Sequence, residues 1–339
     1  MRTKIFLFLI LIASLLSACG LAAETGTPTA APTDTPTALP TLTPTPAVPL
    51  AILVLPTNMN KAESDAFQKV VYDLAQQAGM RFQVRNSLSP ADLEPGLQVV
   101  IALPPDPGIA ALAAAAPQVQ FLAINIPGIS AGGNVSILAS TTQLDVTAFL
   151  AGYIAALVSD DYRTGMIVPK DNPNAQKAMA AFSTGMTFYC GLCRPFYYVP
   201  YTFPQFAEIP ADEDPNRFGG WVNYLVVDRK AYTLYVYPDS KIATQQLFDY
   251  IGTSGAQVIG VSLPNPKPSG WVVTLRPDEI KAIQSAWPGL IAGQGGQSVQ
   301  APLGLGDVDA SVLTPGKLRL VQQVLGELQA GRISTGVTP

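Results

Sequence analysis

Two cysteines with a spacing that can do chemistry stand in the stretch FYCGLCRPFY. Cys190 and Cys193 form a C-x-x-C pair, and the whole chain has three cysteines and no histidine. A C-x-x-C pair can be a redox site, half of a zinc site or a structural disulfide. The missing histidine excludes Ser-His-Asp triads, Cys-His pairs and the usual zinc hydrolase centres.

The N-terminus decides which thiol chemistry is available. Residues 1–20 read MRTKIFLFLILIASLLSACG, with a basic start, an apolar core and then small residues before Cys19. This is the pattern of a secretory signal, and its end resembles the bacterial lipobox, in which the cysteine is lipidated after cleavage. We expect residues 1–18 to be a lipoprotein signal peptide and Cys19 to carry the anchor. The alternative is an ordinary signal peptide with a coincidental cysteine.

A Thr/Pro-rich stretch follows the expected lipidation site. The sequence from 25 to 49 alternates threonine and proline with small residues, which cannot form a core. The stretch is a semi-rigid spacer of at most about 80 Å, and with Cys19 it makes residues 19–49 a disordered stalk. The protein is therefore expected at the cell membrane, lipid-anchored on the extracytoplasmic face.

Charge argues against nucleic acid as a partner. The formal charge is −4, and it becomes −6 when Arg2 and Lys4 leave with the signal. The chain shows no basic patch of the kind that binds phosphate backbones.

The expected location outside the cytoplasm helps to choose among the three possible roles of the C-x-x-C motif. Disulfides persist outside the cytoplasm, and lipidation of Cys19 leaves Cys190 and Cys193 as the only possible pair. A redox motif would open a helix, whereas Pro195 and the strand-like Phe196–Val199 follow here. A structural disulfide in a turn between a helix and a strand is favoured, with a thiol oxidoreductase as the alternative.

Short apolar runs that end in proline recur along the rest of the chain. Continuous runs of this length suit strands buried on both faces, and proline suits a strand end. The predicted strands are 51–56, 99–104, 121–127, 165–169, 234–238 and 258–264, with LIAG at 290–293 as a seventh.

Helical patterns lie between these runs. Asn60 and Glu63 have capping-box spacing before an amphipathic stretch that ends at Gly79. Helices are predicted over 60–79, 107–116, 144–159, 174–186, 243–255, 277–287 and 317–331. Alternating strands and helices predict an α/β chain with two doubly wound parallel-sheet lobes and a hinge crevice.

The pattern resembles the basic membrane lipoprotein family of ABC-transporter substrate-binding proteins. FLAGYIAALVSDDYRTGMIVP (149–169) is similar to that family's "YLAG-x-AA-x-L" helix and following strand. Looser similarities lie in VLPTNMNKAESDAF, in NAQKAMAAFSTGM and in 312–336. The resemblance implies a type I periplasmic-binding fold, a nucleoside-like ligand and an ABC permease as partner.

The same resemblance implies the lobe boundaries. Lobe one would comprise residues 50–140 and 294–325, and lobe two residues 141–293 and 326–339. Residues 200–233 have no counterpart in the family and are interpreted as an insertion, with Tyr224–Val227 as one strand of a hairpin.

Most of the candidate ligand-binding residues follow predicted strands, where open parallel sheets bind their ligands, and Thr141 and Thr142 lie near the expected crossover between the lobes. They are Asn60, Asp106, Asn125, Thr141, Thr142, Asp171, Asn172, Tyr237, Asp239 and Gln294. Capping and turn formation are the competing explanations for several of them. By resemblance, Asn125 and Gln294 stand where the family has acids, and Met59 stands where it has a stacking phenylalanine.

These patterns predict a solute-binding protein of an ABC importer that is not an enzyme and needs no metal or cofactor. A surface binding or sensory lipoprotein that kept the fold without transport is the alternative from another functional class. Gene neighbours would separate the two, since only the first requires a permease and an ATPase.

Overall fold

The computed structural model describes residues 47–337. Cys19, the signal peptide and most of the stalk lie outside the described residues. The strands are β1 Leu50–Val54, β2 Arg81–Arg85, β3 Leu97–Ala102, β4 Gln120–Ile124, β5 Val135–Ala139, β6 Thr164–Pro169, β7 Gln205–Ile209, β8 Thr233–Val236, β9 Gln257–Gly260, β10 Trp271–Pro277, β11 Ser298–Gln300 and β12 Leu303–Gly306. The helices are α1 Lys61–Gln77, α2 Ile109–Ala115, α3 Leu144–Val158, α4 Pro173–Cys190, α5 Phe218–Asn223, α6 Gln245–Ser254, α7 Glu279–Ile291 and α8 Pro315–Gln329, with short helical turns η1 Pro90–Asp92, η2 Pro215–Arg217 and η3 Tyr224–Asp228.

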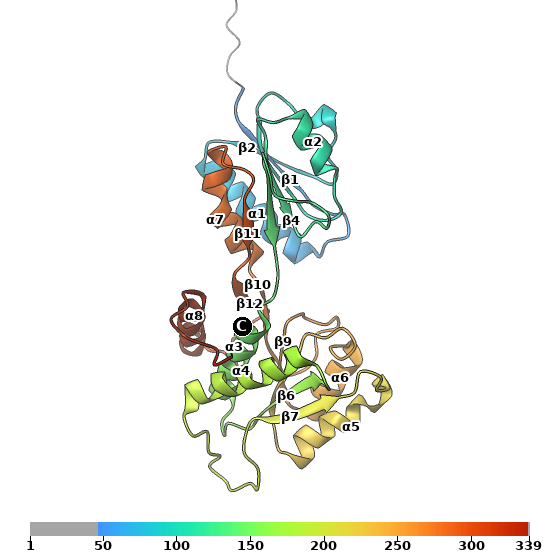
Figure 1. Ribbon diagram of the computed structural model, residues 1–339, viewed down its shortest axis with the longest axis vertical. Helices are drawn as coiled ribbons and strands as arrows, with labels where there is room; N and C mark the ends of the chain where they lie inside the picture. The colour runs from blue at the N-terminus through green and yellow to red at the C-terminus, as the bar shows by residue number, and fades with distance from the viewer. Residues whose placement is uncertain (1–46, 338–339) are drawn as a thin grey trace, which may run out of the picture. The chain divides into compact units, whose positions relative to one another are not determined.

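The first sheet has the strand order β11-β5-β4-β3-β1-β2, and every pairing in it is parallel. Its central strands are buried on both faces, as their continuous apolar sequences predict. Helices α1 and α7 cover one face, and α2 covers the other (Figure 1). We call this sheet with its helices the first lobe.

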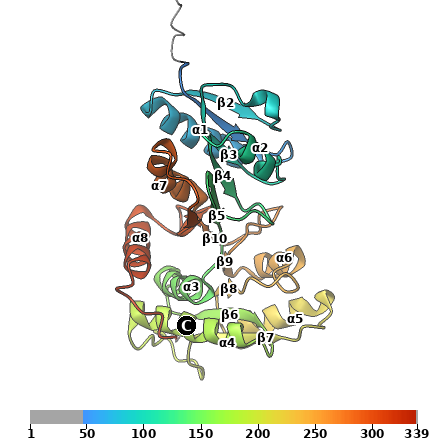
Figure 2. The same ribbon diagram turned by 45° about the horizontal axis from the view of Figure 1, so that its top comes forward.

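The second sheet has the order β12-β10-β9-β8-β6-β7 and is parallel except for the edge strand β12. Helices α3, α4 and α8 cover one face, and α5, η3 and α6 cover the other. The two groups of helices can be followed in Figure 2. This sheet and its helices form the second lobe.

The two sheets share one topology. Counting strands within each lobe, both follow the doubly wound order 2-1-3-4-5 and then add one edge strand. The fold class predicted from the sequence, two α/β lobes of the type I periplasmic-binding kind, is therefore confirmed.

The chain crosses between the lobes three times. The crossings run from β5 to α3, from β10 to α7 and from β11 to β12. Strand pairing and helix packing place α7 and β11 in the first lobe, and β12 and α8 in the second. The sequence had placed 278–293 with the second lobe and 303–325 with the first.

The predicted strand LIAG is wrong. Leu290 and Ile291 are the last residues of α7, and Gly293 adopts a positive φ of 73° in the turn that follows. Trp287 and Leu290 are buried against the first sheet from the helix. A short apolar run is ambiguous between helix and strand, and here the preceding helical periodicity continues through it.

Two further strand predictions are wrong. Tyr224–Val227 belongs to the helical turn η3, whose Leu225 and Val226 pack against the second sheet, so there is no hairpin. Instead β7, within the interpreted insertion, pairs in parallel with β6. Phe196–Val199 also forms no strand and lies in the loop between α4 and β7.

Helices α3 and α4 approach each other at two glycines. A Cβ at Gly152 would lie 2.0 Å from the carbonyl oxygen of Phe182, and one at Gly185 would lie 1.9 Å from that of Phe149. The backbones can touch there only because both residues lack a side chain. Helix α3 is buried almost all round, which explains its unusually apolar sequence.

Candidate functional site

The candidate residues of the first lobe lie at one edge of its sheet. Asn60, Asp106 and Asn125 follow β1, β3 and β4, and Thr141 and Thr142 follow β5. Because these strands are parallel, their carboxyl ends meet at the same edge.

The second lobe repeats this arrangement. Asp171 and Asn172 follow β6, and Tyr237 and Asp239 follow β8, again at the carboxyl edge. The first two crossings leave from the carboxyl ends of β5 and β10, and the third links the carboxyl end of β11 to β12. The crossings therefore join the two carboxyl edges, and nine of the ten candidates lie on these edges.

Gln294 is the exception. It stands between α7 and β11, where the amide of Ile137 donates to the carbonyl of Gln297 and β11 begins beside β5. This is the edge where the parallel strands start, opposite the other candidates. The misplacement follows from the LIAG error, because a strand at 290–293 would have put Gln294 at a carboxyl end.

Four of the polar candidates accept hydrogen bonds from backbone amides of the loops or helix starts in which they lie. Asn60 and Asn172 are N-caps whose side-chain oxygens accept from Ala62 (2.9 Å) and from Asn174 and Ala175 (2.9 and 3.2 Å). The Asp106 carboxylate accepts from the amides of Gly108 and Ile109, and that of Asp239 from the amide of Lys241. Capping and turn chemistry account for these oxygens.

Asn125 organises the region of the first two crossings. Its side-chain oxygen accepts from the Ser140 amide at 2.9 Å, and its side-chain nitrogen donates to the Ser140 hydroxyl and to Glu279. Ser140 lies in the first crossing, and Glu279 opens α7 just after the second. The Ser140 hydroxyl also donates to Glu279 at 2.9 Å. This network, with Asn125 at a φ of 50°, ties both crossings to the end of β4.

The remaining candidates keep polar groups available. The side chains of Thr141, Thr142 and Asp171 make no hydrogen bond to the described residues, and Asp171 has a φ of 57°. Burial, with a smaller contribution from Asp239, raises the pKa of Tyr237, so its phenol is a neutral donor at physiological pH. These groups can hold a small polar molecule by hydrogen bonds.

Two small pockets lie beside the carboxyl edges. One of about 210 Å³ lies at the crossings and is lined by Thr141, Thr142, Gln143, Val146, Pro277, Gln300, Ala301, Pro302, Leu303, Leu328 and Gln329. Another of about 150 Å³ lies past β8 and β9 and is lined by Val236, Ala243, Gln245, Phe248, Val261, Ser262 and Pro264. Both are smaller than the roughly 300 Å³ typical of sites for drug-sized ligands.

Several of these lining residues were not among the candidates predicted from the sequence. Ser262 stands two residues after the end of β9 in VIGVSLP, so the strand-end signal was present. Gln300 ends β11, a strand too short to be recognised, and its side chain donates to the Thr141 carbonyl at 3.1 Å.

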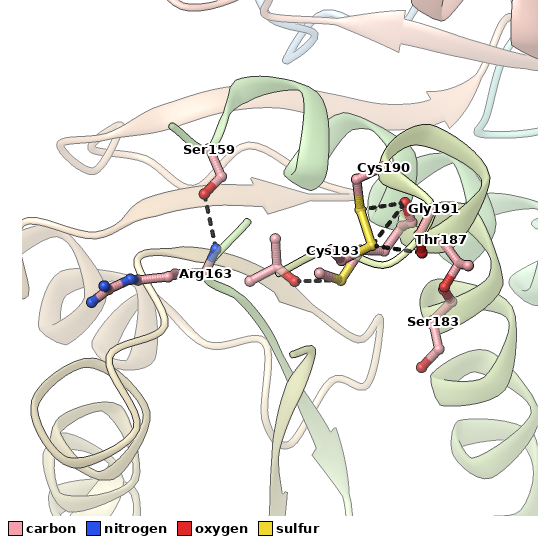
Figure 3. Close-up of a disulfide and its surroundings, with 9 residues drawn as sticks. Ser159, Arg163, Ser183, Thr187, Cys190, Gly191 and Cys193 are labelled. Atoms are coloured by element: carbon pink, nitrogen blue, oxygen red, sulfur yellow. Dashed lines mark hydrogen bonds between the residues drawn. A yellow bond between two sulfur atoms is a disulfide. The ribbon is translucent and has the colours of Figure 1, made fainter. Parts of the chain in front are cut away.

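The C-x-x-C pair forms a disulfide at the C-terminal end of α4 (Figure 3). Cys193 is buried against Ala156 and Met186, and the Cys190 sulfur lies 3.1 Å from the Met186 carbonyl oxygen. Carbonyl groups surround the sulfurs, whereas a reactive thiolate is stabilised by a helix N-terminus or a cation. The surroundings favour the structural role.

Two further features of the described residues concern metal ions and membranes. Within residues 47–337, no group of three or more Cys, Asp or Glu side chains is placed to hold a metal ion. No helix among the described residues is long and apolar enough to cross a membrane.

No protein-family model matches the chain, and no curated protein matches it. Solved structures do match. An ABC transporter solute-binding protein from Conexibacter woesei DSM 14684 is 18% identical at a TM-score of 0.49, over 86% of this chain and 100% of that one. A second solute-binding protein, from Aeropyrum pernix K1, is 14% identical at 0.43, over 85% and 93%. A transcriptional activator of the comK gene from Bacillus halodurans is 12% identical at 0.45, over 82% and 96%. All three TM-scores are below 0.5, so these likenesses identify no ligand for this chain.

Proposed function

We propose that this protein is a lipid-anchored, extracytoplasmic solute-binding protein without catalytic activity, which captures a small polar molecule and delivers it to an ABC permease. One observation carries the proposal. All three crossings connect the carboxyl edges of the two sheets, which are the edges where parallel sheets bind ligands. A ligand that contacts both edges would be enclosed as the lobes move about the crossings.

The network around Asn125 supports the hinge role. It holds Ser140 and Glu279 to the end of β4, so the bending positions are restricted to residues between this network and the second lobe. For the first crossing these are Thr141 to Gln143. A hinge of few residues absorbs the whole rotation, and its neighbours stay rigid.

The ligand chemistry is that of a hydrogen-bonding solute. Thr141, Thr142 and Asp171 offer hydroxyl and carboxylate groups that the described fold does not use. A nucleoside-like ligand follows only from the family resemblance. The loops at the carboxyl edges of the described sheets offer no phenylalanine or tryptophan outside the helices for stacking on a base.

A ligand panel tests the proposal. Residues 46–339 form one compact unit that contains both sheets, so they can be produced without the N-terminal segment. Thermal unfolding is measured with nucleosides, bases, sugars, polyols and amino acids. A ligand at about 100 times its dissociation constant adds about 2.7 kcal/mol to the free energy of unfolding. The variant Asp171→Asn should lose much of the shift, whereas Asp73→Asn, on the exposed face of α1, should keep it.

Several candidate side chains at the carboxyl edges form helix caps and turns. This favours one alternative, a surface binding or sensory lipoprotein that has fewer groups free to bind a ligand. Asn60, Asp106, Asn172 and Asp239 have oxygens engaged by local amides. If no member of the panel shifts the unfolding transition, solute transport is abandoned in favour of this role.

A further inference from the structure

The most exposed large apolar side chains of the described chain gather in the loop between α4 and β7. Leu192 is 84% exposed, Phe196 and Tyr197 are 79% exposed, and Tyr198 is 91% exposed. We call residues 191–204 the aromatic loop. Phe188 and Tyr189, partly exposed on the last turn of α4, extend its apolar surface and contact the rings of Phe149 and Tyr153. Contiguous exposed apolar side chains of this size mark interaction sites.

The backbone beneath these side chains is fixed. The disulfide joins Cys190 to Cys193, whose side chain is buried in a small cluster with Met186 (Figure 3). The amide of Phe196 donates to the carboxylate of Asp161, which is held 2.7 Å from Arg163 by an ion pair. The loop therefore presents its apolar side chains from an anchored backbone, which lowers the conformational entropy lost on binding.

The composition of this surface matches a bilayer interface. Residues 187–204 read TFYCGLCRPFYYVPYTFP and include one cation, Arg194, and no acidic residue, in a chain whose formal charge is −4. Tyrosine is favoured at the headgroup level, where its ring is buried and its hydroxyl stays hydrated. We propose that the aromatic loop inserts into the interfacial region of a lipid bilayer, with Leu192, Phe196, Tyr197 and Tyr198 as the inserting side chains.

The attachment of the chain permits this contact. The sequence places 27 residues between Cys19 and Ala47, which span up to about 80 Å when extended. A compact chain of this size is about 50 Å across. An anchor at Cys19, itself part of the proposed function, leaves enough chain for surfaces remote from β1 to reach the same membrane.

The contact would leave the candidate ligand site free. The loop joins the end of α4 to the start of β7, so it lies at the edge where the strands of the second sheet begin. Asp171 and Tyr237 lie at the opposite edge. The inference does not depend on transport or on any ligand.

Vesicle sedimentation with residues 46–339 tests the inference, because this unit lacks the lipidated cysteine. The vesicles contain phosphatidylglycerol and phosphatidylethanolamine in equal parts, with phosphatidylcholine alone for comparison. The protein should sediment with the anionic vesicles. Replacing three loop residues (Leu192→Ser, Phe196→Ser and Tyr198→Ser) should lower the partition coefficient on the order of tenfold or more.

A matched control removes three exposed apolar side chains elsewhere, by Val227→Ser, Ile291→Ser and Leu320→Ser. This variant should bind vesicles as the parent does, and thermal unfolding checks that both variants are folded. A Tyr198→Trp reporter should show a blue-shifted emission that lipid-borne quenchers reduce. Absence of parent binding, equal loss in both variants or an unshifted reporter overturns the inference. If the parent self-associates but does not bind vesicles, and the loop variant loses the self-association, the aromatic loop contacts a second copy of this chain instead of a bilayer.

Discussion

Tyr235 is a fully buried residue of β8 whose hydroxyl has no hydrogen-bond partner among the described residues. Its ring stacks on Phe182 with centroids 6.0 Å apart. A buried hydroxyl without a partner costs about 1–3 kcal/mol. Tyr235→Phe should therefore raise the free energy of unfolding by about 1 kcal/mol in urea titrations, whereas Tyr72→Phe, on the exposed face of α1, should change it little. A clear loss of stability in Tyr235→Phe would reveal a partner for the hydroxyl.

The same residue predicts a pH dependence. Burial, with a smaller effect of Tyr237, raises the pKa of Tyr235 above its ordinary value. The unfolded chain thus releases this proton first, near pH 10, and ionisation stabilises the unfolded state. Stability should fall as pH rises above about 10. Tyr235→Phe should flatten the fall, and an unchanged slope would contradict the assignment.

Asn125 should be a structural residue of the hinge rather than a ligand contact. An aspartate there, the acid that the family resemblance implies, would place a carboxylate beside Glu279, 2.5 Å from the present side-chain nitrogen. Asn125→Asp should cost about 1–3 kcal/mol at neutral pH, because two carboxylates would then face each other. Asn125→Gly keeps the positive φ and should be milder than Asn125→Ala. If all three variants were as stable as the parent, the hydrogen bonds of Asn125 would contribute nothing to stability.

At the scale of elements, the contact between α3 and α4 makes the sharpest prediction. Gly152→Ala or Gly185→Ala improves helix propensity, yet the new Cβ would lie about 2 Å from a carbonyl oxygen. Each should cost about 3 kcal/mol or more, because the helices must separate. Gly326→Ala in α8, where a Cβ meets nothing within 4 Å, should instead gain up to about 1 kcal/mol. The free energy of unfolding of the three variants is measured in urea. An unchanged value for Gly152→Ala would contradict the close approach of the two helices.

The disulfide should stabilise the chain and do nothing else. The closed loop is short, so the chain-entropy estimate is about 2 kcal/mol. Cys190→Ala with Cys193→Ala should lower the free energy of unfolding by about that amount and leave any ligand shift intact. An insulin-reduction assay separates the structural role of the disulfide from a redox role. Turnover by the parent that the double variant lacks would support the thiol oxidoreductase instead.

The sequence predicted the helices better than the strands. All seven predicted helices are present, but only six of the nine predicted strands are. Six strands of the described chain were not predicted: β2, β5, β7, β10, β11 and β12. The edge strand β2, RFQVR, is only partly buried and has no continuous apolar run, whereas β10 was missed although it is buried. Tyr224–Val227 was assigned to a strand because its apolar run does not distinguish a strand from a buried helical turn.

The sequence indicated where in the fold the candidate residues lie, but not which hydrogen bonds their side chains make. Position after a predicted strand brought seven candidates to the carboxyl edges, and the expected crossover between the lobes brought Thr141 and Thr142 there. Sequence indicated a helix cap at Asn60 but could not decide whether Asn60 and Asn172 would use their oxygens on caps or on a ligand, since capping and ligand binding favour the same residue types. Gln294 failed because a helix-to-strand error moved it to the opposite edge of the sheet.

At the scale of the whole molecule, closure of the two lobes on a solute is the central claim. Residues 46–339 hold only the two disulfide-bonded cysteines, so cysteines introduced by Thr57→Cys and Lys241→Cys can each take a spin label. Both positions are exposed, in loops at the carboxyl edges of the first and second sheets. The distance distribution between the labels is measured by pulsed electron paramagnetic resonance, without and with a saturating solute from the panel. If the lobes close on the solute, the distance distribution becomes shorter and narrower when the solute is bound. An unchanged distribution with the solute bound would contradict this closure.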